Sequence, residues 1–266
     1  MKLTEKAVEQ FQREGYLKIG HQVLDDHHLA TLREHYDSVF AQKHGTFGEG
    51  MRNIAAIGES ADDPEADHSE VMLQIQQMWQ RDEVFRELLY HSPLLDIAES
   101  LIGPNIQVFF DQALYKPANH GGAVQWHQDN GYWGCVPPNL VSIWMALDDA
   151  DEENGCMNVI PGSHREGGAE HERAMTEKGK LPALLTAKVD TERAVAVPVK
   201  AGYAMVHHCL MLHQTNPNTS ARERRAMIIH YMPTGTRTRE GSLMVEQPVV
   251  RGELQVEDES GEEVGA

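Results

Sequence analysis

The order of hydrophobic and polar positions divides the chain into a helical first part and a strand-rich second part. Residues 4–14, and a segment from Asp25 to about residue 41, have apolar positions three to four residues apart, as on one face of a helix. Asp25 is a typical N-terminal cap of the second helix. Between the two, residues 15–20 (GYLKIG) favour a strand. The apolar face of the second helix carries Leu29, Leu32, Tyr36, Val39 and Phe40.

Two more helices are expected before residue 104. The pattern predicts one from about Ser69 to Leu89. It predicts another that Ser92 caps, with Pro93 at its first position and Gly103 just past its end.

From residue 105 onward, short apolar segments alternate with turns rich in Gly, Pro, Asn and Asp, which is typical of strands. The segments are IQVFFDQALYKP, AVQWHQD, LVSIWMALDD, CMNVIPGS, AVAVPVKAGYAMVHH and RAMIIHYMP. Helices followed by a run of strands indicate a mainly β fold, a barrel or sandwich with flanking helices. We expect one domain over residues 1–250, with a helical part at about 1–103 and a barrel core at about 104–235. The acidic tail, residues 251–266, is expected to be disordered.

Two long polar segments have no place in the predicted barrel. Residues 42–68 are rich in glycine and acid, and residues 165–190 are polar and helix-prone. Long irregular segments over a scaffold commonly close over a binding site, so both are candidate lids. The alternative is that they are surface insertions.

Charge and composition argue against several classes of protein. The net charge is −18, from 41 acidic and 23 basic residues, which disfavours nucleic-acid binding by phosphate neutralisation. No apolar run of ~18 residues is present, so we expect no membrane span, and the first residues lack the apolar stretch of a secretory signal. We therefore expect a cytoplasmic protein. The three cysteines, Cys135, Cys156 and Cys209, are too scattered for a disulfide framework.

The stretch VQWHQDNGYWG, residues 124–134, sets His127 and Asp129 two positions apart. On a strand, successive side chains alternate between faces, so the two residues are predicted to point the same way. They are either polar residues on a wet face or two ligands of a metal. A third ligand elsewhere in the chain would decide between these interpretations.

Four histidines compete for that third position: His207, His208, His213 and His230. Two histidines and one carboxylate on one face of iron leave coordination positions open, as in non-haem Fe(II) oxygenases. His213 precedes a turn, NPNTS, and Arg224 follows it by eleven residues. Arg224 could bind a ligand carboxylate through paired hydrogen bonds. Alternatively it lies on the surface, as we expect of its neighbours Arg222 and Arg225.

Three ordered motifs carry a family resemblance. KP…WHQDNGYW, WMALDDADEENGCMNVIPGSHREG and LHQTNPNTSARERRA, within residues 109–231, resemble the phytanoyl-CoA dioxygenase family of Fe(II)/2-oxoglutarate oxygenases. The N-terminal FQREGYLKI…LDDHHLATLRE is also similar to that family's opening. The resemblance implies a double-stranded β-helix, the jelly-roll, cupin-like barrel. It also implies that His127, Asp129 and His213 are the iron ligands.

The resemblance extends to the co-substrate. Arg224 matches the arginine that binds the distal carboxylate of 2-oxoglutarate. Thr215 stands where the family usually has serine, and its hydroxyl can make the same hydrogen bond. Gln112, Lys116 and Trp144 are expected on strands that line the same barrel, where each either helps to hold 2-oxoglutarate or is structural.

Other residues near the motifs receive less specific roles. Tyr132 and Trp133 follow the metal motif and are candidates for an aromatic wall that contacts the substrate. His207 and His208 lack the turn and the arginine that follow His213, so we expect them to be packing or strand-face residues. His164, in PGSH, is expected to be structural.

The resemblance implies an Fe(II)- and 2-oxoglutarate-dependent dioxygenase that hydroxylates a small organic metabolite with O₂ and releases succinate and CO₂. Ascorbate would be a compatible reductant, and the protein would be a monomer or homodimer. Because related halogenases replace the carboxylate with a small residue, Asp129 favours hydroxylation over halogenation. Two alternatives remain: a cupin-like metalloenzyme that does not use 2-oxoglutarate, and a non-catalytic protein that binds iron or 2-oxoglutarate. The sequence does not identify the substrate.

Overall fold

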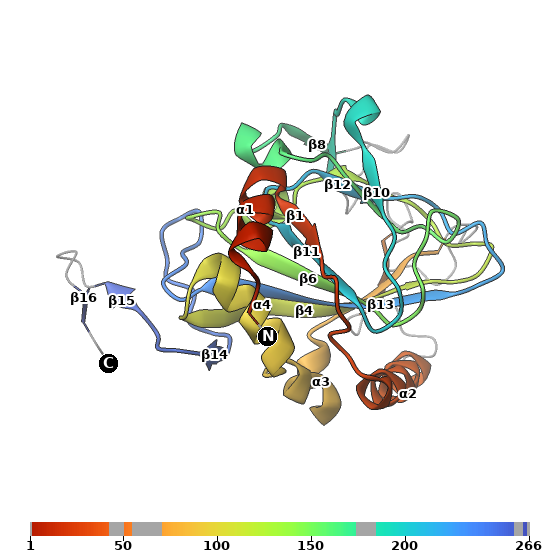
Figure 1. Ribbon diagram of the computed structural model, residues 1–266, viewed down its shortest axis with the longest axis horizontal. Helices are drawn as coiled ribbons and strands as arrows, with labels where there is room; N and C mark the ends of the chain where they lie inside the picture. Colours follow the sequence, from red (N-terminus) through yellow and green to blue (C-terminus); the bar gives the residue numbers. More distant parts are fainter. Residues whose placement is uncertain (1, 43–50, 55–70, 174–184, 258–262, 265–266) are drawn as a thin grey trace.

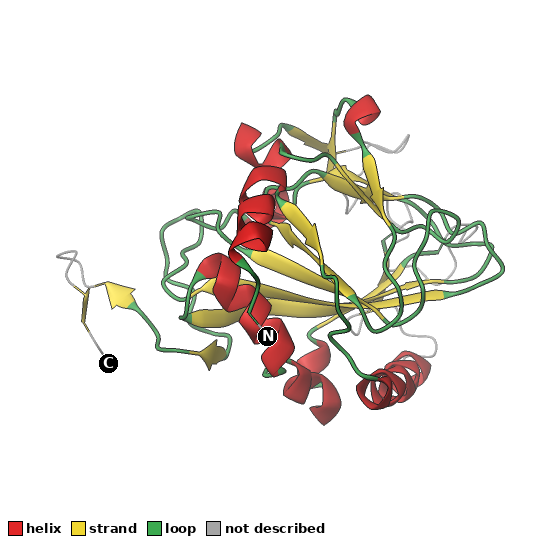
Figure 2. Ribbon diagram, viewed as in Figure 1, coloured by secondary structure: helices red, strands yellow, loops and turns green. Residues whose placement is uncertain are grey.

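Two antiparallel sheets face each other in the computed structural model, which describes residues 2–42, 51–54, 71–173, 185–257 and 263–264 (Figures 1 and 2). The larger sheet has the strand order β1-β11-β6-β13-β4-β3-β2, with β14 also paired to β4. The smaller sheet has the order β10-β7-β12-β5. Apart from the consecutive strands β2, β3 and β4, neighbours in each sheet are not consecutive in sequence, which is the connectivity of a jelly roll. The fold is a double-stranded β-helix, so the predicted fold class is confirmed.

Most strands are short, and the two longest, β4 and β13, pair with each other in the larger sheet. That sheet contains β1 (Tyr16–Lys18), β2 (Met51–Asn53), β3 (Leu73–Gln76), β4 (Ile106–Lys116), β6 (Val141–Ala146), β11 (Ala204–His208), β13 (Arg224–Pro233) and β14 (Val249–Arg251). The smaller sheet contains β5 (Val124–His127), β7 (Met157–Val159), β10 (Val195–Val197) and β12 (His213–Thr215). Two further pairs are β8 (His171–Arg173) with β9 (Leu185–Ala187), and β15 (Val256–Glu257) with β16 (Glu263–Val264).

Helices α2, α3 and α4 lie on the side of the larger sheet that faces away from the smaller sheet (Figure 1). Asp25 caps α2, as predicted, by accepting from the backbone N–H of His28, and Thr4 caps α1 by accepting from that of Ala7. Within the described parts of the chain, no helix is long and apolar enough to cross a lipid bilayer. The helices are α1 (Glu5–Glu14), α2 (Asp26–Gln42), α3 (Glu83–Leu88), α4 (Ser92–Ile102) and α5 (Asp129–Trp133), with 3₁₀ helices η1 (Met78–Gln80), η2 (Ser163–Glu166) and η3 (Thr191–Arg193).

The helix predicted from Ser69 to Leu89 is wrong over residues 71–77. Residues 73–76 form strand β3, which pairs with β4 and β2. Gln77 then has a left-handed backbone, with φ of 56°, so a helix cannot continue through it. Pairing with the long strand β4 overrides the local helical pattern, and only η1 and α3 remain helical.

One smaller expectation also needs correction. Helix α4 begins at Ser92 itself, and His91 is its cap position, so Ser92 is not the cap. The segment 165–190 has a helix-prone sequence, but its described ends form only the end of η2 and the strands β8 and β9. Residues 174–184, and all of the segment 42–68 except residues 42 and 51–54, lie outside the described residues, so the expected lids are not tested.

The two faces of the larger sheet have different surroundings. On β13, Met227, Ile229 and Tyr231 join the large hydrophobic core under the helices, whereas Ile228 packs in a second cluster with residues of the smaller sheet. His230 is on the same face as Ile228 because side chains alternate along a strand. The sheet register therefore sets polar side chains between the two sheets.

Candidate metal centre and its cavity

His127, Asp129 and His213 meet between the sheets. Each offers a ligand atom within 4.8 Å of the others, and all three side chains are buried. His127 ends β5 and His213 begins β12, and the antiparallel pairing of these strands sets the two histidines directly opposite each other. The pairing of strands far apart in sequence thus brings together the residues that the sequence nominated as ligands.

Asp129 reaches the site differently from the prediction. Strand β5 ends at His127, and Asp129 is the first residue of the short helix α5, so the two do not alternate along one strand. Gln128 lies between the strand and the helix, and three hydrogen bonds hold its side chain. Its side-chain amide donates to the carbonyls of Gly167 and Leu210 and accepts from the backbone N–H of Ala169. The backbone of Gln128 is itself extended, and Oδ1 of Asp129 lies 3.7 Å from Nε2 of His127.

Hydrogen bonds orient both imidazoles toward the carboxylate. Nδ1 of His127 donates to the carbonyl of Gln125 at 2.7 Å, and Nδ1 of His213 donates to that of Met211 at 2.9 Å. The Nε2 atoms therefore carry the lone pairs, and they lie 3.7 and 3.6 Å from Oδ1 of Asp129. Two imidazoles and one carboxylate, aimed at one point, fit an Fe(II) ion.

The electrostatics of the site favour the protonation states that a metal requires. Burial raises the pKa of Asp129, but its interactions with the surrounding histidines, His213 first, more than offset the effect of burial, and the pKa falls well below its usual range. Burial lowers the pKa of His213 well below its usual range. The carboxylate is therefore ionised and His213 neutral near pH 7, so neither loses a proton on binding a metal.

His207 is a buried residue on a face of strand β11, as expected, but the sequence did not indicate that it also contacts Asp129. Its Nε2 lies 3.1 Å from Oδ2 of Asp129, and the hydroxyl of Ser142 lies 2.9 Å from the same oxygen. The turn and arginine after His213 mark it as a candidate ligand, but they do not indicate which residues contact the candidate ligands from behind. Register does: β11 pairs with β6 so that His207 stands opposite Ser142.

A cavity of about 450 Å³ opens around the three candidate ligands. Most of the other residues expected to have functional roles also line it: Arg224, Thr215, Gln112, Trp144, Tyr132 and Trp133. Lys116 is not in this lining. Its amino group donates instead to the backbone carbonyl of Asn216. His164 lies elsewhere, with Nε2 3.1 Å from the carbonyl of Gln12.

Arg224 is a fully buried cation without an anionic partner among the described residues. Nη1 donates to the carbonyl of Gly155 at 3.2 Å, and the guanidinium lies over the ring of Trp144, 5.4 Å from its centroid. Burial lowers its pKa to about 10. Nε of Arg224 and the hydroxyl of Thr215 are both buried without a hydrogen-bond partner in the described structure. An unpaired buried charge is costly, so this end of the cavity fits an anionic ligand.

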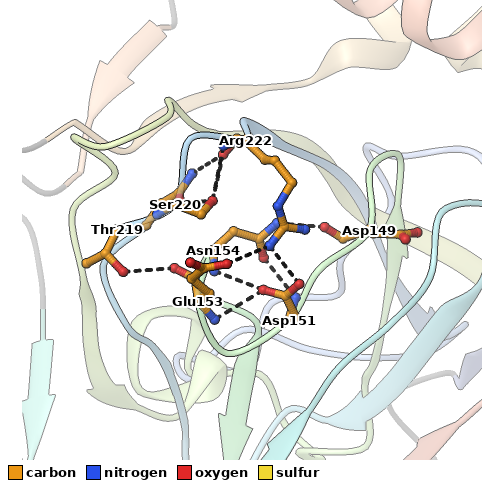
Figure 3. A network of polar contacts seen from close by, with 8 residues as sticks. Asp149, Asp151, Glu153, Asn154, Thr219, Ser220 and Arg222 are labelled. Carbon is orange, nitrogen blue, oxygen red and sulfur yellow. Dashed lines mark hydrogen bonds and ion pairs between the residues drawn. The ribbon is translucent and has the colours of Figure 1, made fainter.

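A network of polar contacts joins residues 149–154 to residues 219–222 (Figure 3). Arg222 donates to the carboxylates of Asp151 and Glu153, and Thr219 donates to the carbonyl of Glu153. Asn154 closes its own turn by accepting from the backbone N–H of Asp151. The network joins the loop that carries Gly155 to the loop between β12 and β13. Arg222 and Arg224 are thus two positions apart but differ in environment, one partly exposed in ion pairs and one buried.

Comparison with known proteins identifies the family. The family model described as phytanoyl-CoA dioxygenase matches residues 11–226, most of the chain. The chain belongs to the phytanoyl-CoA dioxygenase family. The expected resemblance is confirmed, and all the residues proposed above for metal and anion binding lie inside the matched region.

Relatives within and near this family differ in how much they share with the chain. A phytanoyl-CoA dioxygenase domain-containing protein 1 homolog from Caenorhabditis briggsae is 29% identical over 57% of the chain, which covers only 55% of that relative. An L-proline trans-4-hydroxylase from Streptomyces griseoviridis is 27% identical, with 83% of each protein covered. The crystal structure of the non-haem alpha-ketoglutarate-dependent carbocyclase SnoK from nogalamycin biosynthesis has a TM-score of 0.73 and 25% identity, covering 93% of this chain and 96% of SnoK.

Proposed function

We propose that the protein is an Fe(II)- and 2-oxoglutarate-dependent dioxygenase that hydroxylates a small organic molecule and releases succinate and CO₂. One observation carries this proposal. The guanidinium of Arg224 is buried without an acidic partner among the described residues, and it shares a cavity with two imidazoles and one carboxylate that converge on one point. Such a set holds a metal while leaving positions open, and a second anchor in the same cavity suits a dicarboxylate.

Each residue has a defined task in this proposal. His127, Asp129 and His213 would hold iron, which together with O₂ and 2-oxoglutarate supplies the oxidising power. Arg224 would pair with the distal carboxylate of 2-oxoglutarate, and the unpartnered hydroxyl of Thr215 would donate to the same group. Trp144 supports the guanidinium from one face. The buried guanidinium has no acidic partner among the described residues. A carboxylate that binds there therefore gains charge-assisted hydrogen bonds in a fixed orientation.

The remaining walls of the cavity describe its substrate. Phe109, Phe110, Tyr132 and Trp133 line it with aromatic rings, and Trp133 packs against both phenylalanines. A cavity of about 450 Å³ with aromatic walls and a few polar groups suits a small molecule. The similarity to an L-proline trans-4-hydroxylase supports a substrate in this size class. We propose that Tyr132 and Trp133 contact this substrate.

The test is a turnover assay with the purified full chain. Protein prepared without oxygen is mixed with Fe(II), 2-oxoglutarate and candidate metabolites, then exposed to air, and succinate is measured. We expect succinate to form, slowly without substrate and faster with it. Saturable binding of Ni(II) and 2-oxoglutarate without any succinate across a broad metabolite panel would favour a non-catalytic binding protein. Metal binding without 2-oxoglutarate binding would favour a cupin-like enzyme in which Arg224 binds the substrate.

A further inference from the structure

Four side chains form a row across the larger sheet beneath Asp129. His230 of β13 stands between Phe110 of β4 and Ser142 of β6, and Ser142 stands opposite His207 of β11. All these strands present the row to the face that looks toward the smaller sheet. The pairing register of the four strands aligns this row, from Phe110 at one end to His207 at the other.

The two oxygens of Asp129 have different surroundings. Oδ1 faces the Nε2 atoms of His127 and His213, at 3.7 and 3.6 Å. Oδ2 faces away from them and lies 2.9 Å from the hydroxyl of Ser142 and 3.1 Å from Nε2 of His207. One oxygen is therefore turned to the candidate metal position, and the other is held by two donors from the sheet.

The donor and acceptor of each hydrogen bond from Asp129 to His230 can be assigned in only one way. An ionised Asp129 can only accept, so Ser142 must give it its single hydroxyl hydrogen. Ser142 then accepts from Nδ1 of His230 at 2.7 Å, which places the proton of that ring on Nδ1. Burial lowers the pKa of His230 to about 4, so the ring is neutral and its Nε2 is an acceptor.

The same logic carries the chain to the cavity wall. Nε2 of His230 accepts from the side-chain amide of Gln112 at 2.8 Å. The carbonyl oxygen of Gln112 accepts from the amide of Gln74 at 2.5 Å, and Gln74 lines the cavity. Each donor in this chain has one acceptor, so reversing any bond would leave a buried polar group unpaired. The hydrogen bonds of the chain therefore all run in one direction, from Gln74 toward Oδ2 of Asp129.

We propose that Ser142 and His207 are positioning residues that hold Oδ2 of Asp129, so that the carboxylate offers a single oxygen to the metal, and that His230, Gln112 and Gln74 maintain this orientation. A carboxylate free to turn could bind through both oxygens and occupy a coordination position that O₂ or 2-oxoglutarate needs. The inference rests on the proposed metal site but not on turnover.

The experiment uses Co(II) alone as the probe of the full-length protein, with binding measured by titration and coordination by visible absorption. Partners that orient metal ligands typically change metal affinity by roughly 10- to 100-fold. We expect Ser142→Ala and His207→Phe each to weaken Co(II) binding within that range and to change the absorption spectrum. Gln74→Leu, at the far end of the chain, should change affinity less than either.

Conservative variants separate positioning from packing. His207→Gln keeps a donor near the position of Nε2 and should restore most of the affinity lost in His207→Phe. Ser220→Ala, which removes a buried hydroxyl bonded to Asn218 outside the chain, should bind Co(II) like the wild type. Thermal melts of every variant show which are folded.

The outcomes distinguish this inference from the proposed function. Absence of Co(II) binding in the wild type would overturn the metal site itself. Wild-type affinity and spectrum in both Ser142→Ala and His207→Phe would overturn the positioning role while leaving the metal site intact. Equal losses in folded His207→Gln and His207→Phe would also overturn it, because the donor would then be irrelevant.

Discussion

At the scale of single residues, residues that are close in sequence have different roles because their side chains differ in burial. Arg222 and Arg224 differ by two positions, yet the first forms exposed ion pairs and the second is a buried cation that lines the cavity. His207 and His208 are adjacent, and only His207 reaches Asp129. Residue type therefore defines what a side chain can do, and its surroundings decide whether it does so.

The first prediction concerns the candidate ligands. His127→Ala and His213→Ala should each abolish turnover and reduce Fe(II) or Co(II) binding below detection, because either change leaves only two of the three convergent donors. Metal titration and succinate assays measure both effects. His28→Ala, a partly exposed histidine on α2, is the matched control and should leave both unchanged. Retention of metal by His213→Ala would mean that another histidine is the third ligand.

The second prediction concerns the anion site. Arg224→Ala should raise the KM for 2-oxoglutarate strongly, since losing a buried charge-assisted contact costs on the order of 2–5 kcal/mol. Metal binding should persist, because Arg224 contacts none of the three ligands. Arg222→Ala should have a KM close to that of the wild type, because exposed ion pairs contribute little. Similar KM values for both variants would show that general positive charge, and not a defined site, attracts the co-substrate.

At the scale of secondary-structure elements, tertiary pairing changed several local preferences. Strand β3 replaced part of a predicted helix because β4 offers it a paired edge. The site depends on this replacement, since β3 contributes Gln74 and Gln76 to the cavity lining. Asp111 lies on the opposite face of β4. One of its carboxylate oxygens accepts from the backbone N–H of Trp79 in η1, which directly follows β3.

The third prediction is a pH dependence of stability at Asp111. Burial raises its pKa to about 7, above the unfolded value of about 4. The folded state therefore favours the protonated form, and the stability that it contributes is full below pH ~4 and lost as pH rises to about 7. Asp111→Asn removes this loss, so its advantage over the wild type should grow by up to about 4 kcal/mol between pH 4 and pH 8.

Chemical denaturation of both proteins at pH 4, 6 and 8 measures this difference. Asparagine can still accept from the backbone N–H of Trp79, so the contact itself is preserved in the variant. A constant difference in unfolding free energy across the three pH values would contradict the raised pKa.

At the scale of the whole molecule, the larger sheet separates stability from function. One face packs against the helices in the large hydrophobic core, and the other face carries the cavity and the row under Asp129. Because side chains alternate, adjacent residues of one strand belong to different tasks. Ile229 lies in the core under the helices, and Ile228 lines the cavity.

The fourth prediction compares these two isoleucines. Ile229→Ala should lower the free energy of unfolding by roughly 2–5 kcal/mol, because it leaves a void in a packed core. Its folded fraction should bind metal and 2-oxoglutarate normally. Ile228→Ala should cost less stability, because its side chain already borders a cavity, but should weaken 2-oxoglutarate binding. Denaturation curves and calorimetric titration measure both quantities, and the reverse pattern would show that the two faces are not separated in this way.

The sequence by itself determined the class of fold and the chemistry of the site. The periodicity of residues 4–14 and 25–41 and the turn-bounded apolar segments after residue 105 sufficed for helices followed by strands, because these signals are local. The motifs containing His127, Asp129, His213 and Arg224 indicated the family, because residue type and spacing carry that information. The family match confirms that interpretation.

Only the tertiary structure decided how those residues are oriented and which residues support them. Local patterns cannot show that β5 ends before Asp129, that β3 is a strand, or that Lys116 is not in the cavity lining. The support of Asp129 by Ser142, His207 and His230 depends on strands drawn from three separate parts of the chain. Such contacts are fixed by sheet register, and register follows from the packing of the whole fold rather than from any segment of it.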